Sequence, residues 1–130
     1  MEEGVNYKVG DKLTQNKYSW HRVSNLLFLE SPAGVGFSYN TNTSMPYTDG
    51  ITAVDNLNAI LDFFEKFSEY RSHKFWLAGE SYAGKYIPQL ATSIDHYNAF
   101  DAPDGKKIDL RGILVGNGVM QYSTTGHHQV

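Results

Sequence analysis

The 130-residue sequence contains no cysteine. The chain therefore offers no disulfide and no thiolate ligand for a metal, and we expect neither a metal site nor a cofactor. Disulfides are typical of oxidising compartments, but their absence does not identify the compartment of this chain.

Long apolar runs and basic clusters are missing as well. No stretch approaches the length of a membrane span, so we expect no membrane insertion. The formal net charge is −3 and no basic cluster exceeds Lys106-Lys107, which predicts no nucleic-acid binding. The first residues, Met1-Glu2-Glu3-Gly4, show neither the basic n-region nor the apolar h-region of a signal peptide. A mature enzyme, a fragment and an intracellular protein would all share these features, so localisation stays open.

What the sequence does contain is typical of a globular domain. Hydrophobic residues make up 41% and aromatic residues 14%, which is enough for a real core. No repeat, low-complexity tract or interdomain linker interrupts the sequence, and we treat residues 1–130 as one domain.

The pattern of apolar runs predicts an α/β fold. A hairpin is expected around Gly10-Asp11, a loop over 31–50 and a turn over 102–107. Short apolar runs predict buried strands at 25–30, 74–78 and 112–116. Between them lie two amphipathic helical stretches, and strand–helix alternation implies parallel strands with right-handed crossover helices.

Each helical stretch carries one apolar stripe. The residues of these stripes are Val54, Leu57, Ile60, Leu61, Phe64 and Phe67 in the first helix, and Tyr86, Ile87, Leu90, Ile94 and Tyr97 in the second. Steps of three and four residues place each set on one side of a helix, facing the core. Pro88 lies early in the second helix, where its missing N–H predicts a bend.

The segment Gly79-Glu80-Ser81-Tyr82-Ala83-Gly84 carries the chemistry. We interpret it as the nucleophile-elbow pattern G-x-S-x-G, with Gly79 and Gly84 as the elbow glycines. A serine on so tight a turn needs small neighbours, because larger side chains would collide. The following helix points its N-terminus at the serine hydroxyl, and the backbone N–H of Tyr82 is a natural oxyanion donor. A glycine-rich structural turn is the alternative interpretation.

Four segments together resemble the serine carboxypeptidases, a family of α/β-hydrolases. They are "NKYSW", "NLLFLESPAGVGFSY", "FWLAGESYAGKYIPQLA" and "GILVGNG", in this order. The resemblance implies a partial α/β-hydrolase fold with Ser81 as the nucleophile and the Tyr82 N–H in the oxyanion hole. The implied substrate is the C-terminus of a peptide or protein. The implied location is lysosomal, vacuolar or secreted.

The resemblance also implies that Glu80 binds the C-terminal carboxylate of the substrate. An ionised Glu80 would repel that carboxylate, whereas a protonated Glu80 can donate a hydrogen bond to it, which partial burial would favour. We therefore expect such a site to work best in acid. The alternative is a solvated glutamate with no role in binding.

The catalytic base and its orienting acid are not evident. In this fold they follow the serine, and the later histidines are His96, His127 and His128, none of which we expect to act on Ser81. By resemblance, the chain corresponds to an internal piece of a serine carboxypeptidase and is inactive alone. A carboxypeptidase-like acyltransferase and a non-catalytic binding or structural remnant are the alternatives. An incomplete sheet also predicts a complementing chain.

Three further features have structural interpretations as well as functional ones. The loop "ESPAGVGFSY" follows a predicted strand, where α/β folds shape their sites, but we expect it to be mainly structural. Asn117 lies between two glycines and is interpreted as a turn residue. Asn42-Thr43-Ser44 is an N-glycosylation sequon, which matters only in a secretory pathway.

Overall fold

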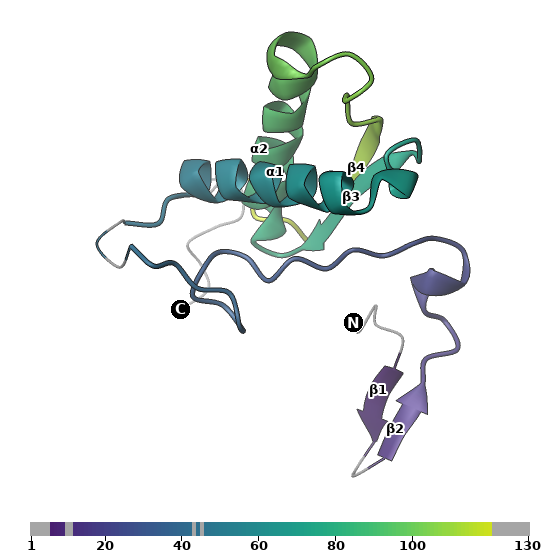
Figure 1. Ribbon diagram of the computed structural model, residues 1–130. Coiled ribbons are helices and arrows are strands. Elements are labelled where there is room, and N and C mark those ends of the chain that lie inside the picture. Colours follow the sequence, from purple (N-terminus) through teal and green to yellow (C-terminus); the bar gives the residue numbers. More distant parts are fainter. Residues whose placement is uncertain (1–5, 10–11, 43, 45, 121–130) are drawn as a thin grey trace.

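A computed structural model of the chain describes residues 6–9, 12–42, 44 and 46–120. Strands β1 (Asn6–Val9) and β2 (Lys12–Gln15) form the antiparallel hairpin predicted from the sequence. Its turn at Gly10-Asp11 lies outside the described residues. Among the described elements the hairpin packs on no other, and Figure 1 shows it standing apart from the helices.

The main unit is a strand–helix–strand crossover. Strand β3 (Phe75–Glu80) leads into helix α2 (Ala83–His96), and strand β4 (Leu110–Gly116) returns beside β3. The two strands are parallel, and Glu80 is paired with Gly116 at their carboxyl ends. This arrangement confirms the predicted α/β fold with a crossover helix. The helix continues through Pro88 as a single element.

Helix α1 (Asp49–Lys66) lies across α2, as Figure 1 shows. Thr48 caps its first turn by accepting a hydrogen bond from the backbone N–H of Ile51. Short helical turns lie at Trp20–Arg22 and Ser68–Tyr70, and the π-helical turn Tyr97–Asp101 follows α2.

The core fills the space between the two helices and β3. Its buried residues are Ile60, Phe64, Leu77, Ile87, Leu90, Ile94 and Ile108. The helical stripes therefore supply most of the core, as predicted. Val54 and Phe67 are exceptions, with 54% and 46% of their surface exposed. Val54 directly follows the buried Ala53 and points about 100° away from it around the helix, and Phe67 lies just beyond the last residue of α1.

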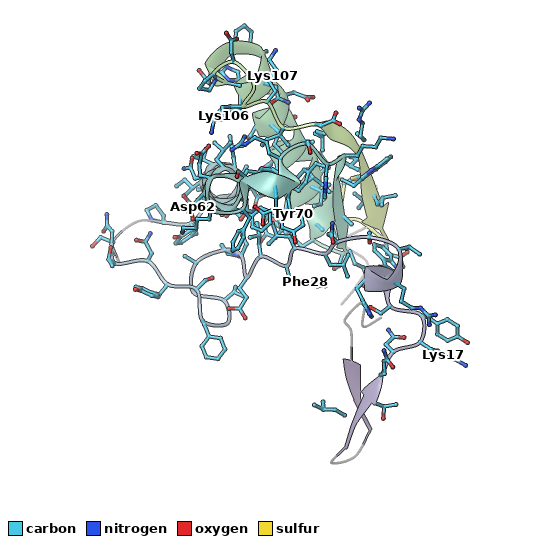
Figure 2. All side chains as sticks on the ribbon, turned by 45° about the vertical axis from the view of Figure 1, so that its right-hand side comes forward. Lys17, Phe28, Asp62, Tyr70, Lys106 and Lys107 are labelled. Atoms are coloured by element: carbon cyan, nitrogen blue, oxygen red, sulfur yellow. The ribbon has the colours of Figure 1, made fainter. Side chains whose placement is uncertain are left out.

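A polar cluster joins the end of α1 to the turn before β4. The Glu65 carboxylate accepts hydrogen bonds from Arg71 and Lys106, and Arg71 also donates to the backbone carbonyl of Lys106 at 2.7 Å. The pKa of Glu65 is lowered, chiefly because Lys106 hydrogen-bonds its charged form and adds its own charge, with a smaller effect of the Arg71 charge. Figure 2 shows Lys106 on this turn, close to α1.

The strand predicted at 25–30 is wrong. This segment is extended but forms no strand, and it runs below α1 and β3 without joining the sheet (Figure 1). Its side chains are largely exposed, including Phe28 at 64% (Figure 2). A strand exists only when a neighbour satisfies its backbone groups, and the described residues place none beside it.

Within the residues that the structure describes, no helix has the length and apolarity needed to cross a membrane.

Candidate active site at the strand-to-helix elbow

Ser81 lies at the corner between β3 and α2. The strand ends at Glu80 and the helix begins at Ala83, so two residues make the whole turn. Ser81 has φ of 60°, in the left-handed region that costs a residue with a side chain about 1–3 kcal/mol. Its side chain is exposed. Strain of this kind persists only where surrounding contacts enforce it.

Backbone hydrogen bonds from the last residue of β4 and from the segment after it enforce this conformation. The Ser81 N–H donates to the carbonyl of Gly116 at 3.0 Å, and the Ser81 carbonyl accepts from the N–H of Val119 at 2.9 Å. The same carbonyl accepts from the N–H of Gly84 at 3.0 Å, which closes the first turn of α2. The elbow is thus held on one side by residues that lie more than thirty positions further along the chain.

The residue two positions after Ser81 is Ala83, so the segment departs from a strict G-x-S-x-G pattern. The methyl group of Ala83 occupies the space beside Gly79, where an added Cβ would lie 2.4 Å from it. Gly84, one position further, faces the backbone of residues 118 and 119 instead. An added Cβ there would lie 2.6 Å from the Val119 nitrogen. The two predicted elbow glycines therefore relieve two different contacts.

Tyr82 is the last residue before α2. Its backbone is helical, with φ of −63° and ψ of −13°, so its N–H belongs to the N-terminal end of the helix, where negative charge is favoured. Its hydroxyl donates to the two oxygens of the Asp49 carboxylate at 3.2 and 3.3 Å. Its ring packs on that of Tyr86 with centroids 4.9 Å apart.

Asp49 was missed in the sequence analysis. It lies directly after the capping Thr48, where an acidic residue is an ordinary feature of a helix N-terminus. No local pattern distinguishes it, because its contact with Tyr82 joins two elements 33 residues apart.

Glu80 is the last residue of β3 and is exposed beside Ser81. The structure therefore gives Glu80 no burial that would favour its protonated form. Its position at the carboxyl end of the strand nevertheless keeps the carboxyl group accessible next to the serine.

No described histidine contacts Ser81. His21 hydrogen-bonds the Ser19 hydroxyl at 2.6 Å, and the ring of His73 packs on Tyr70. His96 pairs with Asp101 at the far end of α2, and fourteen helical residues at about 1.5 Å each put it about 20 Å from the elbow. His127 and His128 lie outside the described residues. Within the described part of the chain, Ser81 has no general base.

The remaining sequence candidates have structural roles or lie away from Ser81. In the loop after residue 30, the Glu30 carboxylate accepts from the backbone N–H of Phe37 at 2.7 Å. Asn117 has φ of 44°, as its interpretation as a turn residue requires. Asn42 is exposed.

A groove of about 700 Å³ lies between the loop of residues 28–40 and α1. None of residues 79–84 lines it. It is therefore separate from the elbow.

Comparison with known proteins identifies the family. A family model described as serine carboxypeptidase matches residues 3–130. Serine carboxypeptidase 24 of Arabidopsis thaliana is 50% identical over 125 residues, which cover 92% of this chain and 26% of the relative. A serine carboxypeptidase of Caenorhabditis elegans is 43% identical over 114 residues, or 87% of this chain and 23% of that protein.

A solved structure has the same fold. It is that of Kex1(delta)p, a prohormone-processing carboxypeptidase from Saccharomyces cerevisiae, with a TM-score of 0.81 and 34% identity. The match covers 90% of this chain and 26% of the yeast chain. The sequence thus spans about a quarter of the length of the relatives that it matches.

Proposed function

Because the chain belongs to the serine carboxypeptidase family, we propose that it supplies the nucleophile for hydrolysis of C-terminal peptide bonds. The observation that carries this proposal is the conformation of Ser81. An exposed serine is held at φ of 60° between a strand and the N-terminus of a helix, and strained residues of this kind cluster at active sites.

The proposed reaction has two steps. The Ser81 Oγ attacks the carbonyl carbon of the last peptide bond while a general base takes its proton. The C–N bond then breaks, the leaving amine takes up that proton, and an acyl-enzyme remains. In the second step water adds to the acyl group while the base takes its proton, and that proton passes to the Ser81 Oγ as the ester bond breaks. Each step passes through an oxyanion.

Tyr82 is proposed to stabilise that oxyanion through its backbone N–H. The donor lies at the start of α2, and the helix dipole there adds to the effect. Loss of one such donor typically lowers the rate by about two to three powers of ten. The reaction also needs a general base, an acid that orients the base, and a second oxyanion donor. We place these groups outside the described residues.

Glu80 is proposed to bind the C-terminal carboxylate of the substrate. In its protonated form the side chain donates a hydrogen bond, whereas the ionised form repels the carboxylate. Substrate binding should therefore favour acid, consistent with an acidic compartment. Exposure of Glu80 beside Ser81 supports this role.

The test uses an active enzyme that carries these 130 residues. We expect it to release the C-terminal residue of a blocked dipeptide near pH 5 and to be labelled at Ser81 by a fluorophosphonate. The Ser81→Ala variant should lose about four to six powers of ten in kcat and all labelling. Turnover that survives this substitution would remove Ser81 from the reaction. Release that occurs only when another hydroxyl compound accepts the acyl group would identify a transferase instead.

A separate assay tests whether the 130-residue chain acts alone. We expect no turnover, since a serine without a base is a weak nucleophile. Turnover that disappears in Ser81→Ala would contradict this expectation and would direct attention to the histidines at positions 127 and 128.

A further inference from the structure

The residue after the nucleophile is tied to a second helix. The Tyr82 hydroxyl is shared between both oxygens of Asp49, at 3.2 and 3.3 Å. Each distance is longer than usual for a hydroxyl donor, as expected when one proton serves two acceptors. The pair is partly buried, and the Tyr86 ring packs against the Tyr82 ring. This contact joins the first residue of α1 to the elbow.

The peptide group between Ser81 and Tyr82 carries the N–H that we assign to the oxyanion hole. Its direction depends on ψ of Ser81 and φ of Tyr82. Backbone hydrogen bonds with Gly116 and Val119 fix the Ser81 end. At the other end, the hydroxyl bond to Asp49 restrains the Tyr82 side chain and, through its Cα, the backbone.

Asp49 is well placed to act as an anchor. It is the first residue of α1, where the positive end of the helix dipole favours a carboxylate. The preceding Thr48 caps the helix through the N–H of Ile51 at 3.3 Å. The carboxylate therefore projects from a fixed helix end and not from a loop.

We propose that Asp49 is a positioning residue for the oxyanion donor. We assign it no contact with the substrate or with Ser81. It acts through the Tyr82 side chain, which it holds so that the Tyr82 N–H stays aimed at the developing negative charge. This inference rests on the proposed function, because only an acyl-transfer reaction at Ser81 gives that N–H a task.

The experiment compares variants in an active enzyme that carries these residues. Tyr82→Phe and Asp49→Ala should each lower kcat about five- to fiftyfold with KM little changed, less than the two to three powers of ten that follow loss of a whole donor. Asp49→Asn keeps an acceptor oxygen and should recover most of the activity. The double variant Tyr82→Phe/Asp49→Ala should be no slower than the slower single variant, because both remove one interaction.

A matched control keeps helix effects apart from positioning. Asp62→Ala also removes a carboxylate from α1, but Asp62 lies on the surface (Figure 2) and pairs with Lys66, so kcat should not change. Rates are normalised to the fraction of Ser81 that a fluorophosphonate labels. An aldehyde analogue of the peptide substrate, which forms a tetrahedral adduct, should bind the Asp49→Ala variant more weakly by the same factor as kcat falls.

Two outcomes would overturn the inference. One is an unchanged kcat per labelled site in Asp49→Ala, even if the variant melts at a lower temperature. The other is a double variant whose loss is the product of the two single losses. Failure of the proposed function would look different, because the parent enzyme would then show no labelling of Ser81 at all.

Discussion

Gly84 sets how closely the elbow approaches the segment after β4. A Cβ at this position would lie 2.6 Å from the Val119 nitrogen and 2.8 Å from the carbonyl carbons of Gly118 and Val119. All three atoms belong to the backbone and cannot turn aside as a flexible side chain would. The substitution Gly84→Ala should therefore push residues 118 and 119 away from α2.

Several opposing effects decide how much Gly84→Ala changes the free energy of unfolding. Alanine in place of glycine inside a helix favours folding by up to about 1 kcal/mol. Overpacking costs about 1–3 kcal/mol, and separation of the Val119 N–H from the Ser81 carbonyl, 2.9 Å apart, removes about 1 kcal/mol more. The sum predicts that Gly84→Ala lowers the free energy of unfolding by about 1–3 kcal/mol. It should also reduce labelling of Ser81, because Ser81 loses part of its support.

Urea unfolding at constant m-value measures the first effect, and the rate of fluorophosphonate labelling measures the second. Gly50→Ala is the matched control. It lies in the first turn of α1, where an added Cβ would meet only the Thr48 hydroxyl oxygen, at 3.9 Å. It should leave stability unchanged or raise it by up to about 1 kcal/mol. If Gly84→Ala behaves like Gly50→Ala in both measurements, the close approach is not what holds the elbow.

Three further predictions test other parts of the structure. Ile94→Ala should lower the free energy of unfolding in urea by about 2–5 kcal/mol, because Ile94 is fully buried. The exposed Val54→Ala should lower it by less than about 1 kcal/mol, and similar losses for both variants would contradict the assigned core. Glu65 has a pKa lowered from its ordinary value of 4.5, so its contribution to stability is complete above that pH and is lost as pH falls through the lowered pKa. Glu65→Gln should therefore lower the urea midpoint at about pH 7 and have less effect at about pH 3, and an equal effect at both would refute the pairing with Lys106. In an active enzyme, Glu80→Gln should weaken the preference for peptides with free over amidated C-termini and flatten the acid optimum of kcat/KM. If the variant and the parent have identical pH profiles of kcat/KM on both kinds of peptide, Glu80 does not bind the substrate.

The spacing of apolar residues was sufficient to predict the two long helices, whose backbone hydrogen bonds are internal, and the two strands that pair with each other. The apolar spacing of Ile60 and Phe64 predicted α1, and that of Ile87, Leu90 and Ile94 predicted α2. The runs at β3 and β4 predicted parallel strands, because the helix between them returns the chain in the same direction. The stripe was less exact residue by residue, since the buried side chain in the first turns of α1 is Ala53 and the predicted Val54 is exposed.

The elbow was predicted from its glycines and serine, but its supports were not. The contacts of Ser81 with Gly116 and Val119 and of Tyr82 with Asp49 each join residues more than thirty positions apart. No spacing rule connects such residues. The G-x-S-x-G pattern reflects the need for small residues around the serine. Alanine meets that need at position 83, where its methyl group fits beside Gly79.

The segment 25–30 failed as a strand for a reason that also bears on the site. Its apolar run fits a strand covered on both faces, yet Phe28 is 64% exposed and no described strand lies beside it. Trp76 of β3 and Leu114 of β4 are likewise 53% and 49% exposed, so the β3–β4 pair also leaves large apolar side chains open to solvent. An apolar run predicts burial, but only a neighbour can provide it. Ser81 likewise depends on neighbours. The described residues include those that hold its strained backbone, but they do not include a base that could take its proton.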